Sequence, residues 1–275
     1  MNKNSKLPIS LIVMTLNEEQ MIGDCLDSVP WCNEKLVFDT GSVDQTKKVA
    51  EAHGAVFHSS SWEGFGKTKQ KASPLAQNDW ILSLDADERL SPELGEEIQN
   101  RFERLDPQQI YYFPRRSFYL NRWIGYGGWY PDYQARLFHR SFSNWNQAEI
   151  HEEVVPNNTS EKLQEKLSEK RIKPGSDRKF SKHLIHFVFR NLSHQVQTNN
   201  RYSSLQAEEL FAQGKKFSLF KLLTKPWVKF IENYFWKRGF LDGLAGFVIA
   251  VGSGYSVFLK WAKLWELQNT SHLSS

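Results

Sequence analysis

Cysteine is nearly missing from this sequence, which has only Cys25 and Cys32 among 275 residues. Two cysteines form neither the framework of a disulfide-rich secreted domain nor a cysteine-based zinc site, and they fit a reducing, cytosolic setting. An excess of one charge is lacking too, because 35 basic residues face 31 acidic ones. The resulting net charge of +4 suits anionic partners such as nucleotides or lipid headgroups, but it is too small to predict nucleic-acid binding.

Long apolar runs are scarce as well. The run from Ile9 to Leu16 is short and contains Ser10 and Thr15, which predicts a buried strand rather than a signal peptide. The stretch 239–259 approaches membrane-spanning length, but Asp242 and several glycines weaken it as a transmembrane helix.

The first hundred residues alternate between the patterns of strand and helix. Apolar runs predict strands at 9–14, 35–39, 55–58 and 80–85. Helical spacing predicts helices between them, with Asn17 as the cap of the first, and Ser91-Pro92 opens a further helix. Such alternation is typical of an α/β fold with a Rossmann-like, mostly parallel sheet.

The rest of the chain does not continue this alternation of strand and helix patterns. Aromatic residues and glycines crowd 111–133, and a short strand pattern follows at 134–139, which predicts a mixed sheet with long loops. From about 191 the pattern is helical to the end. We therefore expect one domain over 1–190, divided into halves at 1–105 and 106–190, and a helical extension over 191–275.

Acidic residues follow the predicted strand 80–85. Asp85 and Asp87 would repel each other there unless a cation lay between them and a ligand. Mg²⁺ or Mn²⁺ binds through one or two carboxylates and the oxygens of a substrate phosphate, and it can neutralise a departing diphosphate. The alternative is an acidic start to the helix at Ser91-Pro92, favoured by the helix dipole.

Two other polar segments are expected near these acids, because ligands of parallel sheets bind beyond the carboxyl ends of the strands. Asp39 ends the second strand and precedes Gly41 and Ser42; Ser42 is either a ligand-binding residue or only a helix cap. Residues 63–71 are rich in glycine and lysine, which suits a diphosphate, although a solvated basic helix face would look the same.

Three motifs in this order, TLNEE (15–19), DTGSVDQT (39–46) and LDADE (84–88), resemble family 2 glycosyltransferases of the GT-A fold. The segment 129–140, the His151-Glu152 pair and the stretch 184–210 are similar to a narrower branch, the bacterial lipopolysaccharide inner-core β-glucosyltransferases. The motifs of the family cover about 7–152, and the similarity to the branch extends to about 265.

The resemblance implies a role for individual residues. It implies that Asp87 binds the metal, with His186 either a second ligand or an ordinary core histidine. Inverting members use a carboxylate to deprotonate the acceptor hydroxyl; here that is expected to be Glu152, with Asp132 as the second candidate. The donor nucleotide would be bound by Thr15, Asn17, Glu18, Asp39, Ser42, Lys67, Gln70, Asp85 and Ala86.

The same resemblance implies UDP-glucose as the donor and a glycolipid of the lipopolysaccharide core as the acceptor. In the C-terminal segment, apolar residues such as Trp227, Ile231 and Phe235 recur at helical spacing among lysines. Such basic amphipathic helices lie in membrane interfaces, which predicts peripheral attachment at the cytoplasmic face; a lid packed on the domain is the alternative.

Two rival functions are a nucleotidyltransferase and a catalytically silent glycan- or lipid-binding adaptor. The first is disfavoured because TLNEE lacks a glycine-rich phosphate loop after the first strand, and the second because Asp39, Asp85 and Asp87 are all present.

Overall fold

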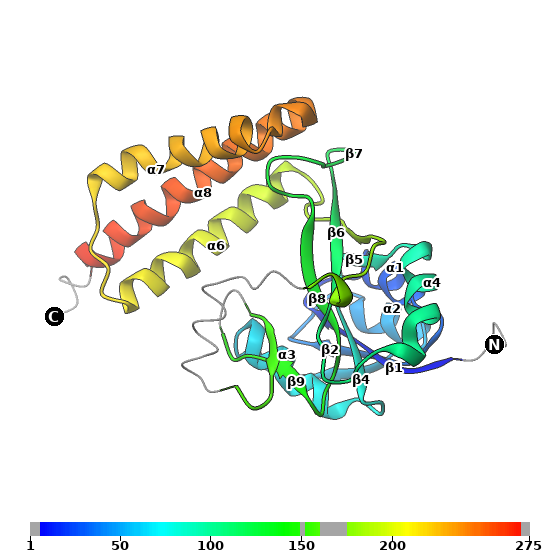
Figure 1. Ribbon diagram of the computed structural model, residues 1–275. Coiled ribbons are helices and arrows are strands. Elements are labelled where there is room, and N and C mark those ends of the chain that lie inside the picture. The colour runs from blue at the N-terminus through cyan, green and yellow to red at the C-terminus, as the bar shows by residue number, and fades with distance from the viewer. Residues whose placement is uncertain (1–5, 149–151, 160–174, 271–275) are drawn as a thin grey trace. The chain divides into compact units, whose positions relative to one another are not determined.

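The computed structural model describes residues 6–148, 152–159 and 175–270 (Figure 1). Its chain forms two compact units. The first comprises Met1–Arg115 and Tyr133–His186, and the second comprises Arg116–Asp132 and Phe187–Ser275. The segment 116–132, which the sequence pattern does not separate from its neighbours, thus groups with the C-terminal helices.

A nine-stranded sheet, in the order β3-β2-β1-β4-β8-β6-β11-β5 with β7 beside β6, organises the fold. The first four strands along this order are parallel, and β4 pairs with β8 antiparallel. This mixture confirms the predicted α/β class. The strands are β1 (Leu7–Thr15), β2 (Cys32–Asp39), β3 (Val56–Ser59), β4 (Trp80–Asp85), β5 (Glu88–Leu90), β6 (Tyr111–Tyr119), β7 (Arg122–Trp123), β8 (Asp132–His139) and β11 (Leu184–His186), with a separate pair β9 (Ser143–Trp145) and β10 (Val154–Pro156).

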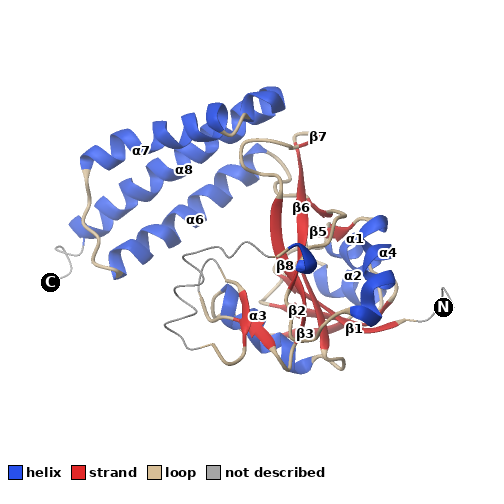
Figure 2. Ribbon diagram, in the orientation of Figure 1, coloured by secondary structure: helices blue, strands red, loops and turns tan. Residues whose placement is uncertain are grey.

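Helices cover both faces of the parallel strands. In Figure 2, α1, α2 and α4 lie on one side of these strands and α3 lies on the other. The helices of this unit are α1 (Ile22–Asp27), α2 (Thr46–Ala52), α3 (Phe65–Ala72) and α4 (Pro92–Arg101), with short 3₁₀ turns at Ser73–Leu75, Phe102–Arg104 and Ser176–Arg178.

Two hydrophobic clusters follow from this layering, because successive strand side chains point to opposite faces. In β1, Leu11 and Val13 join the cluster beneath α1, α2 and α4, whereas Ile12 joins the cluster beneath α3. Cys25 is fully buried in the first cluster, as expected, and burial raises the pKa of its thiol well above the usual value.

Of the helix starts predicted at Ser91 and at Asn17, one is confirmed and one is wrong. Ser91 caps α4 by accepting a hydrogen bond from the N–H of Leu94, as predicted. The predicted cap at Asn17 is wrong: α1 begins later, at Ile22, and its start has no side-chain cap. Asn17 instead adopts a left-handed conformation (φ +57°), which asparagine tolerates better than most residues, and its side chain bonds to a neighbouring loop.

The second unit consists of the tip of the β6–β8 hairpin and three long helices: α6 (Leu192–Ala212), α7 (Leu219–Ile231) and α8 (Gly243–Thr270). A π-helical turn at Glu232–Trp236 and a 3₁₀ turn at Gly239–Asp242 connect α7 to α8. In Figure 1, α8 runs beside α6 and α7, and it packs against both. The stretch Gly239–Thr270 is long and apolar enough to cross a membrane, by length and composition only.

One buried carboxylate holds the hairpin tip to the helices of this unit. Asp242 is 3% exposed and accepts hydrogen bonds from the N–H groups of Gly125 and Tyr126. The charge that weakens 239–259 as a membrane span therefore has a structural role at the start of α8.

Candidate functional site

Strand register brings the predicted polar strand ends to one edge of the sheet. Thr15 lies opposite Asp39 on the neighbouring strand, and Met14 lies opposite Asp85 on the other side. The hydroxyl of Thr15 donates a hydrogen bond of 2.9 Å to Asp39 Oδ1. Both oxygens of Asp39 also accept bonds from the turn that follows it, from the N–H groups of Gly41 and Ser42 and from the Ser42 hydroxyl.

The loops after β1 and β2 are bonded to each other. The N–H of Asn17 donates to the Ser42 hydroxyl (2.7 Å), and Asn17 Oδ1 accepts from the N–H of Val43 (2.9 Å). The N–H of Glu18 donates to the Thr46 hydroxyl at 2.8 Å. Ser42 is not a helix cap, because α2 begins at Thr46 and its start has no side-chain cap; Ser42 instead joins the two strand-end loops.

The LDADE motif forms the turn between β4 and β5, with Ala86 and Asp87 at its tip. Glu88, which is fully buried, accepts a hydrogen bond of 3.1 Å from the N–H of Asp85 and closes this turn. Its carboxylate lies 2.7 Å from the Arg136 guanidinium and 3.5 Å from that of Arg115. Two cations compensate the burial of this acid, which would otherwise be strongly unfavourable.

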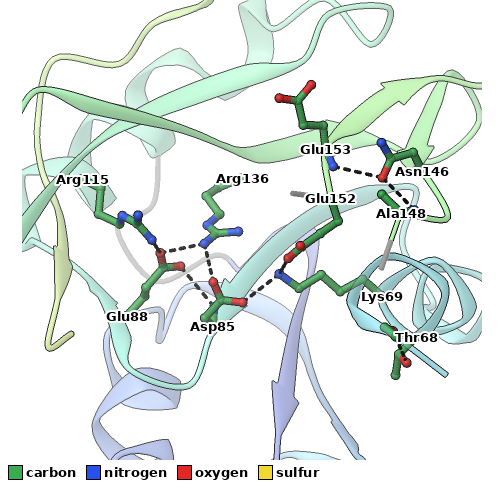
Figure 3. A network of polar contacts seen from close by, with 11 residues as sticks. Thr68, Lys69, Asp85, Glu88, Arg115, Arg136, Asn146, Ala148, Glu152 and Glu153 are labelled. Atoms are coloured by element: carbon green, nitrogen blue, oxygen red, sulfur yellow. Dashed lines mark hydrogen bonds and ion pairs between the residues drawn. The ribbon is translucent and has the colours of Figure 1, made fainter. Parts of the chain in front are cut away.

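Lys69 connects the LDADE turn to the predicted base (Figure 3). Its Nζ lies 2.9 Å from Asp85 Oδ1 and 2.9 Å from Glu152 Oε1, and 4.5 Å from the centre of the Trp145 ring. In Figure 3 the carboxylate of Glu152 faces Lys69, whereas the side chain of Glu153 points away from this group. Lys69 is only 5% exposed, so it is held among these partners.

The charges of this network shift the pKa values of Asp85 and Lys69. Burial by itself would raise the pKa of Asp85, but Arg136 and Lys69 outweigh it and hold that pKa far below its usual value. Burial would lower the pKa of Lys69, yet Asp85 and Glu152 outweigh that effect and raise it. Asp85 is therefore ionised and Lys69 charged at neutral pH.

A divalent cation fits best beside Asp87. Both oxygens of Asp85 are already in ion pairs, Oδ1 with Lys69 and Oδ2 with Arg136 at 2.5 Å. Asp87 Oδ2 instead lies 3.4 Å from His186 Nε2, because β11 pairs with β5 and sets His186 opposite Glu88. Two ligands at right angles on an ion with bonds of about 2.1 Å are about 3 Å apart, close to this spacing.

The protein alone does not surround such an ion. Among the residues that the structure describes, no group of three or more His, Cys, Asp and Glu side chains is placed to hold a metal. Mg²⁺ and Mn²⁺ commonly take only one or two protein ligands and complete their shell with water and substrate phosphate oxygens. The Asp87–His186 pair matches that kind of site.

The structure also shows where the remaining predicted residues lie. Lys67 is exposed on α3, and Gln70 donates to the backbone carbonyl of Trp145 at 3.0 Å. Ala86 is buried at the turn. Asp132, the first residue of β8, groups with the second unit, and His151 lies outside the described residues.

Lys69, Glu88 and Arg136 were not among the predicted site residues. For Lys69 a signal was available: Phe65, Lys69 and Ala72 are spaced as one helical face, and the two apolar members mark that face as the inner one. Glu88 and Arg136 had no comparable signal, because their pairing joins a turn to a strand that is almost fifty residues further along the chain.

Comparison with known proteins agrees with this geometry. A family model described as "Glycosyl transferase family 2" matches residues 10–162. An uncharacterized glycosyltransferase of Rickettsia typhi is 31% identical over 94% of this chain and 87% of its own length. The lipopolysaccharide core biosynthesis glycosyltransferase LpsC of Rhizobium meliloti is 29% identical over 95% of this chain and 93% of its own.

Among solved structures, glucosyl-3-phosphoglycerate synthase from Mycobacterium tuberculosis, in complex with Mn²⁺ and UDP, is 24% identical, with a TM-score of 0.33. That similarity covers 42% of this chain and 44% of the other, and the family assignment does not depend on it.

Proposed function

We propose that this chain, which belongs to glycosyl transferase family 2, transfers a sugar from a UDP-linked donor to a glycolipid acceptor with inversion at the anomeric carbon. Family membership makes it a glycosyltransferase of the GT-A fold. The observation that carries the finer proposal is the meeting of Asp85 and Glu152 at Lys69, on the sheet edge that also bears Thr15 and Asp39.

The donor would bind along this edge. Asp39 and Thr15 offer a buried acceptor and hydroxyl to the nucleoside, and the rigid loops carrying Asn17 and Ser42 form the adjacent wall. Asp39 is already saturated by four hydrogen bonds, so a nucleoside N–H or hydroxyl must displace one of them; the Ser42 hydroxyl can rotate away and is the obvious one.

Glu152 would act as the base. It would accept the proton of the acceptor hydroxyl while that oxygen attacks the anomeric carbon and the bond to the diphosphate breaks. Lys69 holds the Glu152 carboxylate in place through an ion pair of 2.9 Å. Asp132, the first residue of β8, remains the second candidate.

Asp87 and His186 would hold Mg²⁺ or Mn²⁺. When bound, such an ion supplies positive charge to the departing diphosphate. The protein contributes the position of the Asp87 carboxylate at the turn tip and a histidine nitrogen next to it.

The resemblance to lipopolysaccharide core enzymes and the name of the relative LpsC support the choice of acceptor, and the basic amphipathic C-terminal segment supports the location. We propose a lipopolysaccharide-core glycolipid as acceptor, glucose as the sugar, and action at the cytoplasmic face of the cell membrane.

Release of UDP from a panel of UDP-sugars tests this proposal. The protein is assayed with a cell-envelope glycolipid fraction, with and without Mn²⁺ or Mg²⁺. Acceptor-dependent release that needs metal is expected, with a fall of at least a hundredfold in Glu152→Gln, consistent with loss of a general base. The variant Asp87→Asn should lose the dependence of UDP release on metal. Its matched control is Asp27→Asn, which makes the same substitution at an exposed acid at the end of α1. UDP binding without any release would instead identify an adaptor.

A further inference from the structure

The second unit carries an apolar surface that its own packing leaves uncovered. On α7, Phe220, Leu223, Trp227 and Ile231 are exposed at spacings of three and four, so they share one face of the helix. Trp227 is 70% exposed and Phe220 75%. A polar helix face would be expected here if water were its normal environment.

A matching stripe runs along α8. Its members are also exposed and recur at spacings of three and four: Leu244, Phe247, Val251, Tyr255 and Phe258. Near the turn between the helices, the ring of Phe247 from this stripe lies 5.9 Å from that of Phe230, the neighbour of Ile231, and 5.7 Å from that of Tyr234. Phe235, 55% exposed, lies against the same rings.

Positive charge is concentrated in the same segment. Residues 215–242 contain seven Lys or Arg and two acidic residues, a net charge of +5. Since the whole chain carries +4, the remaining residues together carry −1. The positive net charge of this protein thus comes from the segment that contains α7 and leads into α8.

We infer that the exposed stripes of α7 and α8, named here the docking face, insert shallowly into an anionic lipid surface. An apolar face rich in Trp and Phe, flanked by lysines, is what binds the boundary between headgroups and acyl chains. A second copy of this chain is a poorer occupant, because pairing two such faces would bring together two segments of +5. The inference deepens the proposed function, on which it rests for the nature of the acceptor.

The inference differs from a membrane span. About 33% of the most apolar part of Gly239–Thr270 is buried, and α8 packs against α6 and α7. Asp242, at the start of this stretch, accepts a hydrogen bond from the hairpin tip. Crossing a bilayer would require those contacts to be broken. Contact through one face leaves them in place.

Sedimentation of the full chain with vesicles tests this inference. Binding is expected to vesicles containing phosphatidylglycerol, to weaken in high salt, and to be weak on pure phosphatidylcholine. The double variant Phe220→Gln/Trp227→Gln should bind at least tenfold more weakly. Both side chains are exposed, so folding should survive, as an unchanged helical circular dichroism spectrum and melting temperature would show.

Charge is tested by Lys216→Gln/Lys221→Gln, expected to weaken binding to anionic vesicles about thirtyfold, at roughly fivefold per lysine. The matched control is Lys47→Gln/Lys48→Gln, which removes two exposed lysines from α2 in the other unit and should leave binding unchanged.

Three results would overturn the inference: equal binding to neutral and anionic vesicles, resistance to extraction at alkaline pH as shown by spanning proteins, or a dimer in solution that Phe220→Gln/Trp227→Gln dissociates. None of these depends on transfer activity. Vesicle binding without UDP release would leave the docking face intact and refute the proposed enzyme instead.

Discussion

Replacing Lys69 by methionine removes the ammonium group that lies 2.9 Å from both Asp85 and Glu152. The methionine keeps most of the apolar stem and its contact with Trp145. Breaking a buried ion pair from one side costs about 3–5 kcal/mol. Asp85 is 34% exposed and keeps Arg136, so solvent and that guanidinium offset part of the loss. We therefore expect a destabilisation of about 2 kcal/mol, with a fall in melting temperature of about 4–8 °C.

Lys67→Met is the matched control, since it makes the same substitution two residues away on the same helix, at an exposed position. Its melting temperature should stay within about 1 °C of the wild type. Thermal unfolding at pH 7, followed by circular dichroism, compares the two variants.

The pH dependence gives a second measurement. Since the pKa of Asp85 is lowered in the folded protein, its stabilising contribution is present above the unfolded value and is lost as pH falls through the folded one. The difference between wild type and Lys69→Met should therefore be constant from about pH 6 to 9 and shrink below about pH 4. Equal melting temperatures for Lys67→Met and Lys69→Met, or a gap that persists in acid, would refute this account.

Other predictions follow from neighbouring residues. Asp87→Asn should abolish the stimulation of UDP release by Mn²⁺ with a change in melting temperature below about 2 °C; full metal stimulation would remove Asp87 from the proposed metal site. Glu88→Gln should destabilise the protein by about 3 kcal/mol, because it removes the buried carboxylate that pairs with both Arg115 and Arg136 and leaves Arg136 with Asp85; urea unfolding that matches the wild type would contradict this. Gly66→Ala should cost about 1–3 kcal/mol, since the added Cβ would lie 2.3 Å from the backbone oxygen of Asn146; an unchanged urea midpoint would show that the segment yields easily.

Local patterns in the sequence predicted the parallel half of the sheet well. Runs of apolar residues identified β1, β2, β3 and β4 to within three residues at each end, because strands buried on both faces have a simple signature. Strand-end chemistry also followed, since parallel strands necessarily bring their carboxyl ends to one edge. The meeting of Thr15, Asp39 and Asp85 is therefore a consequence of order along the chain.

The choice of charged partners was decided only in three dimensions. Lys67 was predicted to contact the donor, yet Lys69 is the lysine that faces the acids, because α3 turns that side inward. The donor-binding role of Lys67 stays a prediction. Arg136 and Glu88 pair across distant segments, and no local spacing encodes such a pair.

The sequence by itself determined the layers of the first unit, the family and the sheet edge that bears the site, because each depends on periodicity or on short motifs. The tertiary structure decided which partners each aspartate of the LDADE turn has. The resemblance assigned Asp85 to the donor and Asp87 to the metal, but only the folded chain shows that Arg136 and Lys69 pair with the first and that β11 brings a histidine to the second. Electrostatic partners depend on distance in space, and that distance exists only after the chain has folded.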